Sequence, residues 1–217
     1  MSAQFEKKIS VLIVDDHPAT RAGIRAMIEK AKDMVVAGEA ENGEEACRLL
    51  DELRPNIVLL DLVMPGFSAT AFEKWARAKY PETTTLVLTG HHREAYLAGM
   101  IEAGAAGYLE KNVSEEDLLN ALRLAARGEY LISEEQKASA HRWRADIEKK
   151  WHSLSERERE ILRLLALGAT NKFISKKLQI APTTAEKHLA RIYKKLAVTS
   201  RAEAALWGSE HGRDFEY

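Results

Sequence analysis

The sequence predicts an α/β domain with a five-stranded, parallel, doubly wound sheet, followed by a helical linker and an all-α domain of four helices. Two observations predict this fold class. In the first 127 residues, five short apolar runs are each followed by an amphipathic stretch, which favours a parallel sheet covered by helices on both faces. After Gly128 the apolar residues recur only at helical spacing.

The apolar runs give the strands, and the stretches between them give the helices. We expect strands at Ile9–Val14, Met34–Gly38, Ile57–Leu60, Thr85–Leu88 and Gly107–Leu109. We expect helices near 18–31, 43–53, 68–79, 93–103 and 114–127. Ser114, three residues before Asp117, is typical of a capping box that opens the last of these helices.

Charge is distributed unevenly along the 217 residues, whose net charge is −1. From Trp151 onward, 12 Lys and Arg face 8 Asp and Glu, so this part carries +4 and the preceding 150 residues carry −5. Opposite signs at the two ends indicate two domains with different partners. We expect the first domain at 8–127, the linker at 128–151 and the second domain at 152–217.

Composition predicts a soluble protein of the reducing cytoplasm, with no membrane partner. Apolar residues make up 46% of the chain, but no apolar run approaches the roughly 18 residues that span a bilayer. The first ten residues, MSAQFEKKIS, lack the apolar segment of a signal peptide. Cys47 is the only cysteine, and we interpret it as a small buried side chain rather than a reactive thiol.

Polar side chains stand where the predicted strands end. Asp15-Asp16 follows the first strand, and Asp61 follows the third. Thr89 follows the fourth strand, and Lys111 comes just after the fifth. Because sites of open parallel sheets lie at the carboxyl ends of the strands, we expect these side chains to converge. The alternative is that each one merely caps its own strand in solvent.

The chemistry of such a cluster favours phosphoryl transfer. Three neighbouring carboxylates repel one another and need a divalent cation, for which Mg2+ with several retained waters is suited. A bound Mg2+ can orient a phosphoryl donor, so that Asp61 attacks phosphorus and becomes an aspartyl phosphate. Lys111 would pair with one phosphate oxygen, and the hydroxyl of Thr89 would contact another.

Four motifs carry a resemblance to the receiver domains of two-component systems over residues 8–127. They are VLIVDDHP, VLLDLVMPG, LVLTG and GAAGYLEK, in this order. The resemblance implies that Asp61 accepts a phosphoryl group from a sensor histidine kinase. It also implies three Mg2+ ligands, namely the side chains of Asp16 and Asp61 and the backbone carbonyl of Val63. Asp15 would assist in binding the ion.

The same resemblance assigns a switch. Thr89 and Lys111 take the family's switch and phosphate-contact roles, and Tyr108 matches the rotating aromatic residue, with a core strand residue as the alternative. Asn112 stands where many receivers have proline, which concerns the shape of the loop and not the phosphorylation chemistry. We interpret His17 and the pair His91-His92 as loop residues rather than metal ligands.

The linker is expected to be helical. Ser133 with Gln136 is typical of a capping box, and good helix formers follow from about 134 to 149. Trp143, Ile147 and Trp151 form one apolar stripe. We expect this stripe to pack against either domain, and a seam between two copies of the chain is the alternative.

The sequence from Trp151 onward predicts four short helices. Ser155 and Glu158 form a capping box at the first, and Gly168 stops it. The second helix is 171–178, the third begins near Pro182, and the fourth is 200–208. The second and third helices, joined by QIAP, predict a helix-turn-helix.

The third helix has an apolar face and a basic face. Ala185, Leu189, Ile192 and Leu196 lie on one side, opposite Thr183, Lys187, Ala190 and Lys194. The alternative to a binding role is a solvated basic face. A basic face on the second helix of a helix-turn-helix fits the major groove of DNA. We expect DNA contacts from Lys172, Thr183, Thr184, Glu186, Lys187, His188, Arg191, Lys194 and Lys195.

LSERERE, LALGATNKFISKKLQI and TTAEKHLARIYKKLAV resemble a LuxR-type DNA-binding domain over residues 152–212. Together with the receiver, this resemblance implies a transcriptional response regulator of the NarL/FixJ family that binds promoter DNA as a homodimer when phosphorylated. Three departures are Ala181 for a capping Ser, Ala185 for Val, and Glu186 for Lys.

Two other classes of function remain as alternatives. A phosphatase with an aspartyl nucleophile commonly needs a second Asp two residues on, where this chain has Val63. A constitutive DNA-binding protein would use the receiver only for dimerisation, and the intact set of cluster residues counts against it. The sequence leaves open whether the receiver masks the DNA-binding helix.

Overall fold

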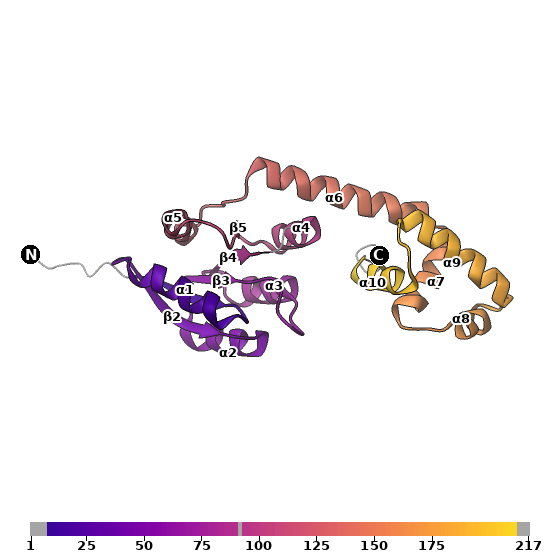
Figure 1. The fold of residues 1–217 in the computed structure, drawn as a ribbon, viewed down its shortest axis with the longest axis horizontal. Coiled ribbons are helices and arrows are strands. Elements are labelled where there is room, and N and C mark those ends of the chain that lie inside the picture. Colours follow the sequence, from indigo (N-terminus) through magenta and orange to yellow (C-terminus); the bar gives the residue numbers. More distant parts are fainter. Residues whose placement is uncertain (1–7, 91–92, 212–217) are drawn as a thin grey trace, which may run out of the picture. The chain divides into compact units, whose positions relative to one another are not determined.

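The computed structural model describes residues 8–90 and 93–211, and the pair His91-His92 lies outside the described residues. The chain forms two compact units, Met1–His141 and Arg142–Tyr217. The first is an α/β unit and the second is made of helices (Figure 1). This division agrees with the fold class that the sequence predicts.

Five parallel strands form the sheet of the first unit. In chain order they are β1 (Ile9–Val14), β2 (Met34–Ala40), β3 (Ile57–Leu60), β4 (Thr84–Thr89) and β5 (Gly107–Glu110). Their order in space is β2-β1-β3-β4-β5. The direction of winding reverses between β1 and β3, and sites of open α/β sheets lie at the carboxyl ends of the strands at such a reversal.

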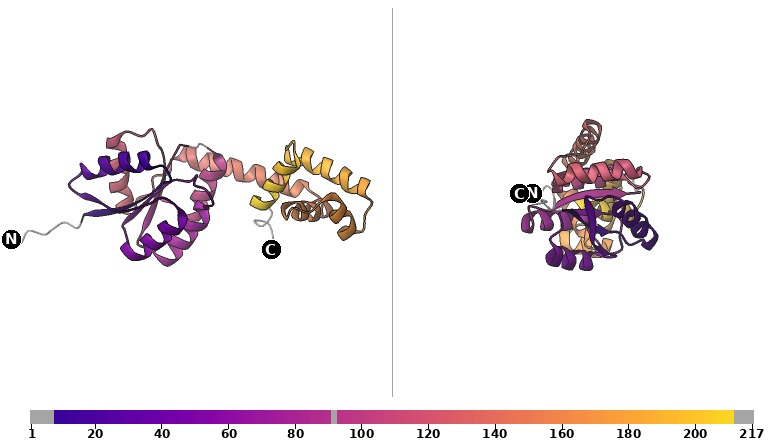
Figure 2. Two further views of the ribbon diagram at one scale, coloured as in Figure 1. Left: turned by 60° about the horizontal axis from the view of Figure 1, so that its bottom comes forward. Right: turned by 90° about the vertical axis from the view of Figure 1, so that its left-hand side faces the viewer.

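Helices cover both faces of this sheet (Figure 2). One face carries α1 (Pro18–Glu29) and α5 (Glu115–Ala126). The other carries α2 (Gly43–Leu53), α3 (Ala69–Lys79) and α4 (Glu94–Ala103). Alternate residues of β3 enter the two cores, Ile57 and Leu59 on one side and Val58 and Leu60 on the other. The doubly wound sheet is confirmed.

Side-chain caps start several of these helices. Asn42 accepts a hydrogen bond from the backbone N–H of Glu45, at 2.9 Å, at the start of α2. Ser114 accepts from the N–H of Asp117 at 3.1 Å, as expected. Its hydroxyl also donates to the Asp117 carboxylate at 2.7 Å. The start of α5 is therefore a variant of the expected capping box, in which the acid accepts from the hydroxyl.

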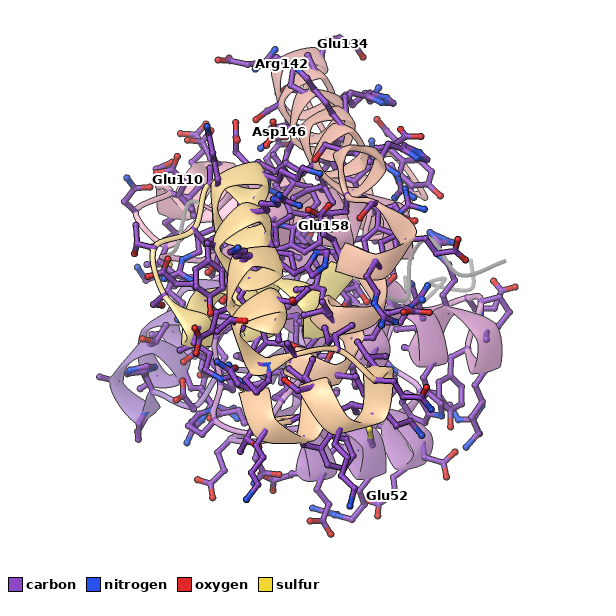
Figure 3. All side chains as sticks on the ribbon, turned by 90° about the vertical axis from the view of Figure 1, so that its right-hand side faces the viewer. Glu52, Glu110, Glu134, Arg142, Asp146 and Glu158 are labelled. Carbon is purple, nitrogen blue, oxygen red and sulfur yellow. The ribbon has the colours of Figure 1, made fainter. Side chains whose placement is uncertain are left out.

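Helix α6 (Glu134–Ser153) begins in the first unit and ends in the second. Both hydrogen bonds of the expected capping box between Ser133 and Gln136 are present, at 2.9 and 3.1 Å. The helix runs four residues beyond the expected end because Trp151 packs in the core of the second unit. Its exposed side includes Glu134, Arg142 and Asp146 (Figure 3).

The apolar stripe of α6 packs against the second unit. Ile147 and Trp151 are 6% and 2% exposed, and Trp143 packs partly buried against the same core. The ring of Trp151 stacks on that of Trp207, with centroids 6.4 Å apart. This packing confirms the first interpretation of the stripe, and it leaves Ile147 and Trp151 covered within one chain rather than free for a seam between copies.

The second unit continues with α7 (Glu156–Ala166), α8 (Asn171–Leu178), α9 (Pro182–Leu196) and α10 (Arg201–His211). The capping box of Ser155 and Glu158 is complete, and Gly168 follows α7 in the left-handed conformation, with φ of 78°. The α8–α9 pair is the expected helix-turn-helix. Within the described part of the chain, no helix is long and apolar enough to cross a membrane.

Candidate functional site

The carboxyl ends of three strands bring Asp15, Asp61 and Lys111 together. The ammonium of Lys111 lies 2.6 Å from Asp15 Oδ2 and 2.7 Å from Asp61 Oδ2. Both carboxylates are buried, with 2% and 3% of their surface exposed. Thr89, at the end of β4 beside β3, is fully buried. Asp15, Asp61 and Lys111 therefore converge as the sequence predicts, and a contact of the Thr89 hydroxyl with a phosphoryl group stays a prediction.

Backbone groups hold the two buried carboxylates in place. Asp61 Oδ1 accepts a hydrogen bond from the N–H of Leu62 at 2.8 Å. Asp15 Oδ1 accepts from the N–H of His17 at 2.8 Å, and the Asp15 carbonyl accepts from the guanidinium of Arg21 at 2.6 Å. Each acid thus keeps one oxygen toward Lys111 and uses the other to fix its own loop.

The charges of the cluster are set by these contacts. Burial alone would lower the pKa of Lys111, but its hydrogen bonds to Asp15 and Asp61 outweigh burial and raise the pKa above its ordinary value. Burial, reinforced by the charges of Asp61 and Glu110, raises the pKa of Tyr108 to about 12. At neutral pH the lysine is therefore a cation and the buried phenol is neutral.

The residues at this edge fit a divalent cation. Ligand atoms of Asp15, Asp16, His17 and Asp61 all lie within 4.8 Å of one another. Asp16 Oδ1 is shielded from solvent, and among the described residues it has no hydrogen-bond partner. Several carboxylate oxygens in so small a space are the donor set that suits Mg2+. The carbonyl of Val63 stays a predicted ligand.

His17 lies beside this group. Its Nδ1 is 2.7 Å from Asp16 Oδ1 and 3.5 Å from Asp15 Oδ1, which are ion-pair distances when the imidazole is protonated. Its interpretation as a loop residue rather than a metal ligand stays a prediction. His17 is also the N-cap of α1, but its side chain makes no capping hydrogen bond.

The departure at Asn112 leaves the lysine in place. The N–H of Lys111 donates to the Thr89 carbonyl at 3.0 Å, and that of Val113 donates to the Glu110 carbonyl at 3.0 Å. The first bond continues the pairing of β4 with β5 to the residue that carries the ammonium, and the second closes a turn just after it. The loop therefore positions Lys111 without a proline.

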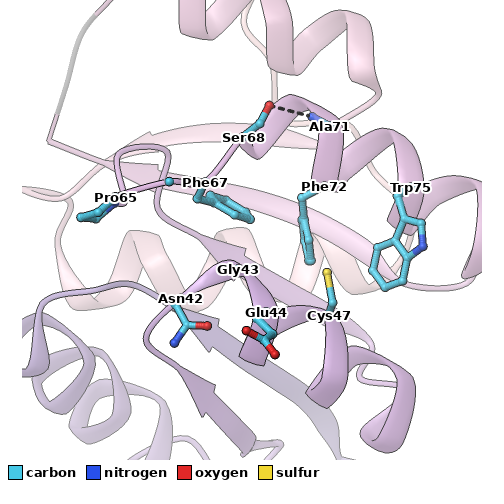
Figure 4. A pocket seen from close by; sticks show the side chains of 11 residues that line it. Asn42, Gly43, Glu44, Cys47, Pro65, Phe67, Ser68, Ala71, Phe72 and Trp75 are labelled. Atoms are coloured by element: carbon cyan, nitrogen blue, oxygen red, sulfur yellow. Dashed lines mark hydrogen bonds between the residues drawn. The ribbon is translucent and has the colours of Figure 1, made fainter.

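A groove of about 590 Å³ lies beside the β3–α3 loop, between α2 and α3 (Figure 4). The rings of Phe67 and Phe72 are 5.6 Å apart, and those of Phe72 and Trp75 are 5.8 Å apart. Phe67 sits so close over Gly43 that a side-chain carbon there would overlap its ring. The ring series thus anchors the loop that follows Asp61.

Cys47 lines the same groove and is half-buried. Burial raises the pKa of its thiol, although the charge of Lys79 opposes this. A thiol with a raised pKa is a poor nucleophile at neutral pH. The structure therefore agrees with the interpretation of Cys47 as a packing residue.

The second candidate site is the basic face of α9. Ala185, Leu189, Ile192 and Leu196 are buried, as expected from their spacing. Six of the residues expected to contact DNA are exposed, namely Lys172, Thr183, Glu186, Lys187, Arg191 and Lys194. Three are half-buried, namely Thr184, His188 and Lys195. Ala181 caps α9 without a side-chain hydrogen bond, as its identity predicts.

Lys195 has a partner inside the domain. Its ammonium lies 2.6 Å from Glu158 Oε2, and Glu158 is only 3% exposed. Burial alone would raise the pKa of Glu158, but hydrogen bonds from Lys195 and Ser155 hold this pKa below its ordinary value. The pair ties the end of α9 to the start of α7. A DNA contact by Lys195 stays a prediction, whereas this positioning role is visible.

Comparison with known proteins identifies both domains. Residues 11–123 match the model of the response regulator receiver domain, and residues 152–207 match that of bacterial regulatory proteins of the luxR family. The nitrate/nitrite response regulator protein NarL of Escherichia coli (strain K12) is 38% identical over 93% of this chain and 95% of its own. The transcriptional regulatory protein YdfI of Bacillus subtilis (strain 168) is 36% identical over 93% and 96%.

Solved structures give the same result. The RcsB response regulator of Salmonella typhimurium has a TM-score of 0.65 and is 27% identical, over 93% of this chain and all of its own. An RcsB–DNA complex has a TM-score of 0.63 at 28% identity, over 94% and 99%. The fold and the two sites thus define a two-domain response regulator. The chain belongs to the NarL/FixJ family, with a receiver domain and a LuxR-type helix-turn-helix domain.

The ion pair of Lys195 and Glu158 predicts an acid-sensitive part of the second unit's stability. Because the folded pKa of Glu158 is depressed, the pair stabilises the folded unit above the ordinary Glu pKa of about 4.3. This contribution is lost as pH falls through the lower, folded value. Lys195→Met should therefore lower the free energy of unfolding at neutral pH, and the difference from the wild type should shrink on acidification.

Urea unfolding followed by tryptophan fluorescence measures this difference, because three of the four tryptophans lie in the second unit. Lys194→Met is the matched control, since Lys194 is exposed. A difference between wild type and Lys195→Met that stays constant on acidification would show that the pair does not carry the stabilisation.

Proposed function

We propose that this response regulator controls transcription in the cytoplasm according to the phosphorylation state of Asp61. A sensor histidine kinase supplies the phosphoryl group, and the phosphorylated chain binds promoter DNA as a dimer. The observation that carries the proposal is the position of Lys111, whose ammonium lies within 2.7 Å of both Asp15 and Asp61. A receiver used only for dimerisation has no need of this buried, paired cluster.

Asp61 has the position that a phosphoacceptor needs. One of its oxygens is fixed by the N–H of Leu62, and the other can attack phosphorus while the bond from phosphorus to the donor breaks. Mg2+, when bound, supplies charge that neutralises and orients the phosphoryl oxygens. Lys111 pairs with one of these oxygens, and the hydroxyl of Thr89 contacts another, so the chemistry is mainly positioning.

The basic face of α9 supports DNA binding. Lys187, Arg191 and Lys194 are exposed, whereas the opposite face of the helix is buried in the domain core. A solved structure of RcsB holds DNA, and another is titled as two RcsB dimers bound to two parallel DNAs. By similarity, we infer that α9 of this chain enters the major groove and that two copies bind together.

The start of α6 supports a route from the receiver to the second unit. The amide of Gln136 donates to the backbone carbonyl of Tyr108 at 3.1 Å, and its oxygen closes the capping box with Ser133. Ser139 donates to Glu94 of α4 at 2.7 Å. Leu131 pairs with Gly107 at the edge of β5. A movement of Tyr108 on phosphorylation would therefore reach α6 through one side chain.

Asp61 is expected to be the phosphorylated residue. A small phosphodonor with Mg2+ should add one hydroxylamine-sensitive phosphate to the wild type and none to Asp61→Asn, which keeps the shape of the side chain but lacks the nucleophile. Asp146→Asn, an exposed position on α6, is the control and should react as the wild type does. Phosphate incorporation by Asp61→Asn at the wild-type rate would refute the assignment.

Gln136→Glu is expected to weaken the coupling between phosphorylation and DNA binding. A glutamate can still accept from Ser133 and keep the capping box, but it cannot donate to the Tyr108 carbonyl. Contacts along such routes modulate coupling by roughly 0.5–2 kcal/mol, so phosphorylation should tighten DNA binding several-fold less than in the wild type. The measurement is DNA affinity by fluorescence anisotropy, with and without a phosphodonor.

The exposed neighbour Glu135 gives a control for this experiment, because Glu135→Gln also changes one charge on the same turn. That variant should respond to phosphorylation as the wild type does. Equal responses of Gln136→Glu and the wild type would mean that the contact with Tyr108 carries no signal.

Lys187 and Lys194 of α9 are expected to contact different parts of the DNA. Lys187, near the N-terminal end, should contact a base edge, worth roughly 1–3 kcal/mol of discrimination. Lys194 lies about two turns further on and should contact only phosphates. Lys187→Ala should therefore flatten sequence preference at one or two positions. Lys194→Ala should weaken all sequences alike and reduce the salt slope by about 1.

Binding of both variants to matched and scrambled sites across a salt series decides between these roles. Glu186, beside Lys187, can accept from a cytosine amino group or repel a phosphate. If Lys194→Ala changed the preferred sequence while Lys187→Ala did not, the helix would be docked differently from this proposal.

A further inference from the structure

Arg21 of α1 connects the ends of two strands beside the cation site. Its side chain is only 12% exposed, and its Nη1 donates to the backbone carbonyl of Asp15 at 2.6 Å. Its Nε lies 3.4 Å from Glu39 Oε2, and its Nη2 lies 3.8 Å from Glu41 Oε2. One guanidinium therefore joins the end of β1 to the end of β2.

The Asp15 carbonyl belongs to the peptide unit that leads into Asp16. Because a peptide unit is planar, a rotation that turns this carbonyl also turns the N–H of Asp16 and redirects the side chain that follows. The Ala40 carbonyl fixes the N–H of Asp15 at 3.1 Å, and Arg21 fixes its carbonyl. Asp15 is buried, so removal of the guanidinium would leave a shielded carbonyl without this donor and favour rotation of the peptide.

Arg25 lies one turn further along α1 and provides a comparison within the same helix. Its guanidinium also pairs with Glu39, and it pairs with Glu29 at 2.9 Å. In the described part of the chain, its hydrogen bonds and ion pairs are with these two glutamates. The two arginines therefore share a partner and a charge, but Arg21 alone of the pair holds the β1–α1 loop.

We propose that Arg21 is a positioning residue for the cation site, which holds the loop of Asp15 and Asp16 through the Asp15 carbonyl and thereby sets the affinity of the receiver for its divalent cation. The proposal rests on the proposed function, because it concerns the Mg2+ that serves phosphorylation of Asp61. A guanidinium offers only donors, so Arg21 acts on the ligands through the backbone and is not itself a ligand.

The sign of the effect separates positioning from charge alone. Arg21 is a cation, so its removal would raise the affinity for a divalent cation if only electrostatic repulsion mattered. Loss of an outer-sphere group that orients the ligands instead costs roughly 10–100-fold in metal affinity. We therefore expect Arg21→Gln to bind the ion roughly tenfold more weakly. Arg25→Gln, the matched control, should bind it at least as tightly as the wild type.

Titration of the full-length protein with Mn2+ tests this expectation, because electron paramagnetic resonance measures the free ion directly. Displacement of Mn2+ by Mg2+ then gives the affinity for Mg2+. Arg21→Lys keeps the charge but replaces the fork of donors by one ammonium, so its affinity should lie between those of Arg21→Gln and the wild type. Circular dichroism and urea unfolding without added metal check that each variant is folded.

Phosphorylation by a small phosphodonor across a Mg2+ series gives a second readout. Arg21→Gln should need roughly tenfold more Mg2+ to reach half of its maximal rate, whereas its rate at saturating Mg2+ should approach that of the wild type. A merely structural role of Arg21 would lower the maximal rate without changing the Mg2+ requirement, and that result would count against the proposal.

The outcomes separate the two proposals. If the wild type binds Mn2+ and Mg2+ and the folded Arg21→Gln binds them as tightly, or if Arg25→Gln loses as much affinity, the role of Arg21 is overturned and the proposed function stands. Should Arg21→Gln not fold, Arg21→Lys decides, and wild-type affinity of that variant overturns the role. If the wild type binds neither ion, the Mg2+-dependent phosphorylation of Asp61 and the role of Arg21 both fail.

Discussion

The structure depends on one electrostatic arrangement, in which two buried carboxylates share a single ammonium. Asp15 and Asp61 stand at the ends of adjacent central strands, β1 and β3, and Lys111 reaches both from the end of β5. Burial strengthens these interactions because the local dielectric is low. Any new negative charge on Asp61 must therefore be compensated by rearranging its surroundings. This sensitivity is what makes the edge of the sheet suitable for a switch.

Much of this arrangement could be predicted from the sequence. Apolar runs such as Ile57–Leu60 report burial on both faces of a sheet, and the rule that sites lie at the carboxyl ends of parallel strands selects Asp61 without any structure. The buried face of α9 also followed from spacing, since Ala185 and Leu189 are one turn apart. Periodicity and strand ends depend only on residues that are close in the chain, so they can be predicted from a single sequence.

The rest depends on contacts between residues that are distant in the chain. Lys195 looks like one more cation on a basic helix, and only the fold shows that it pairs with Glu158, 37 residues away. The sequence predicts that Gln136 caps α6, but its hydrogen bond to the Tyr108 carbonyl requires β5 to lie beside α6. His17 illustrates a third case, because its neighbours in sequence were evident but the direction of its side chain was not.

We propose that the charge state of Asp61 controls DNA binding by the second unit. DNA affinity measured by gel shift with and without beryllofluoride, which mimics a phosphoryl group on aspartate, tests this claim most directly. We expect beryllofluoride with Mg2+ to tighten DNA binding by the wild type and to have no effect on DNA binding by Asp61→Asn. Equal DNA affinity of the wild type in the presence and absence of beryllofluoride, with the mimic shown to be bound, would contradict it.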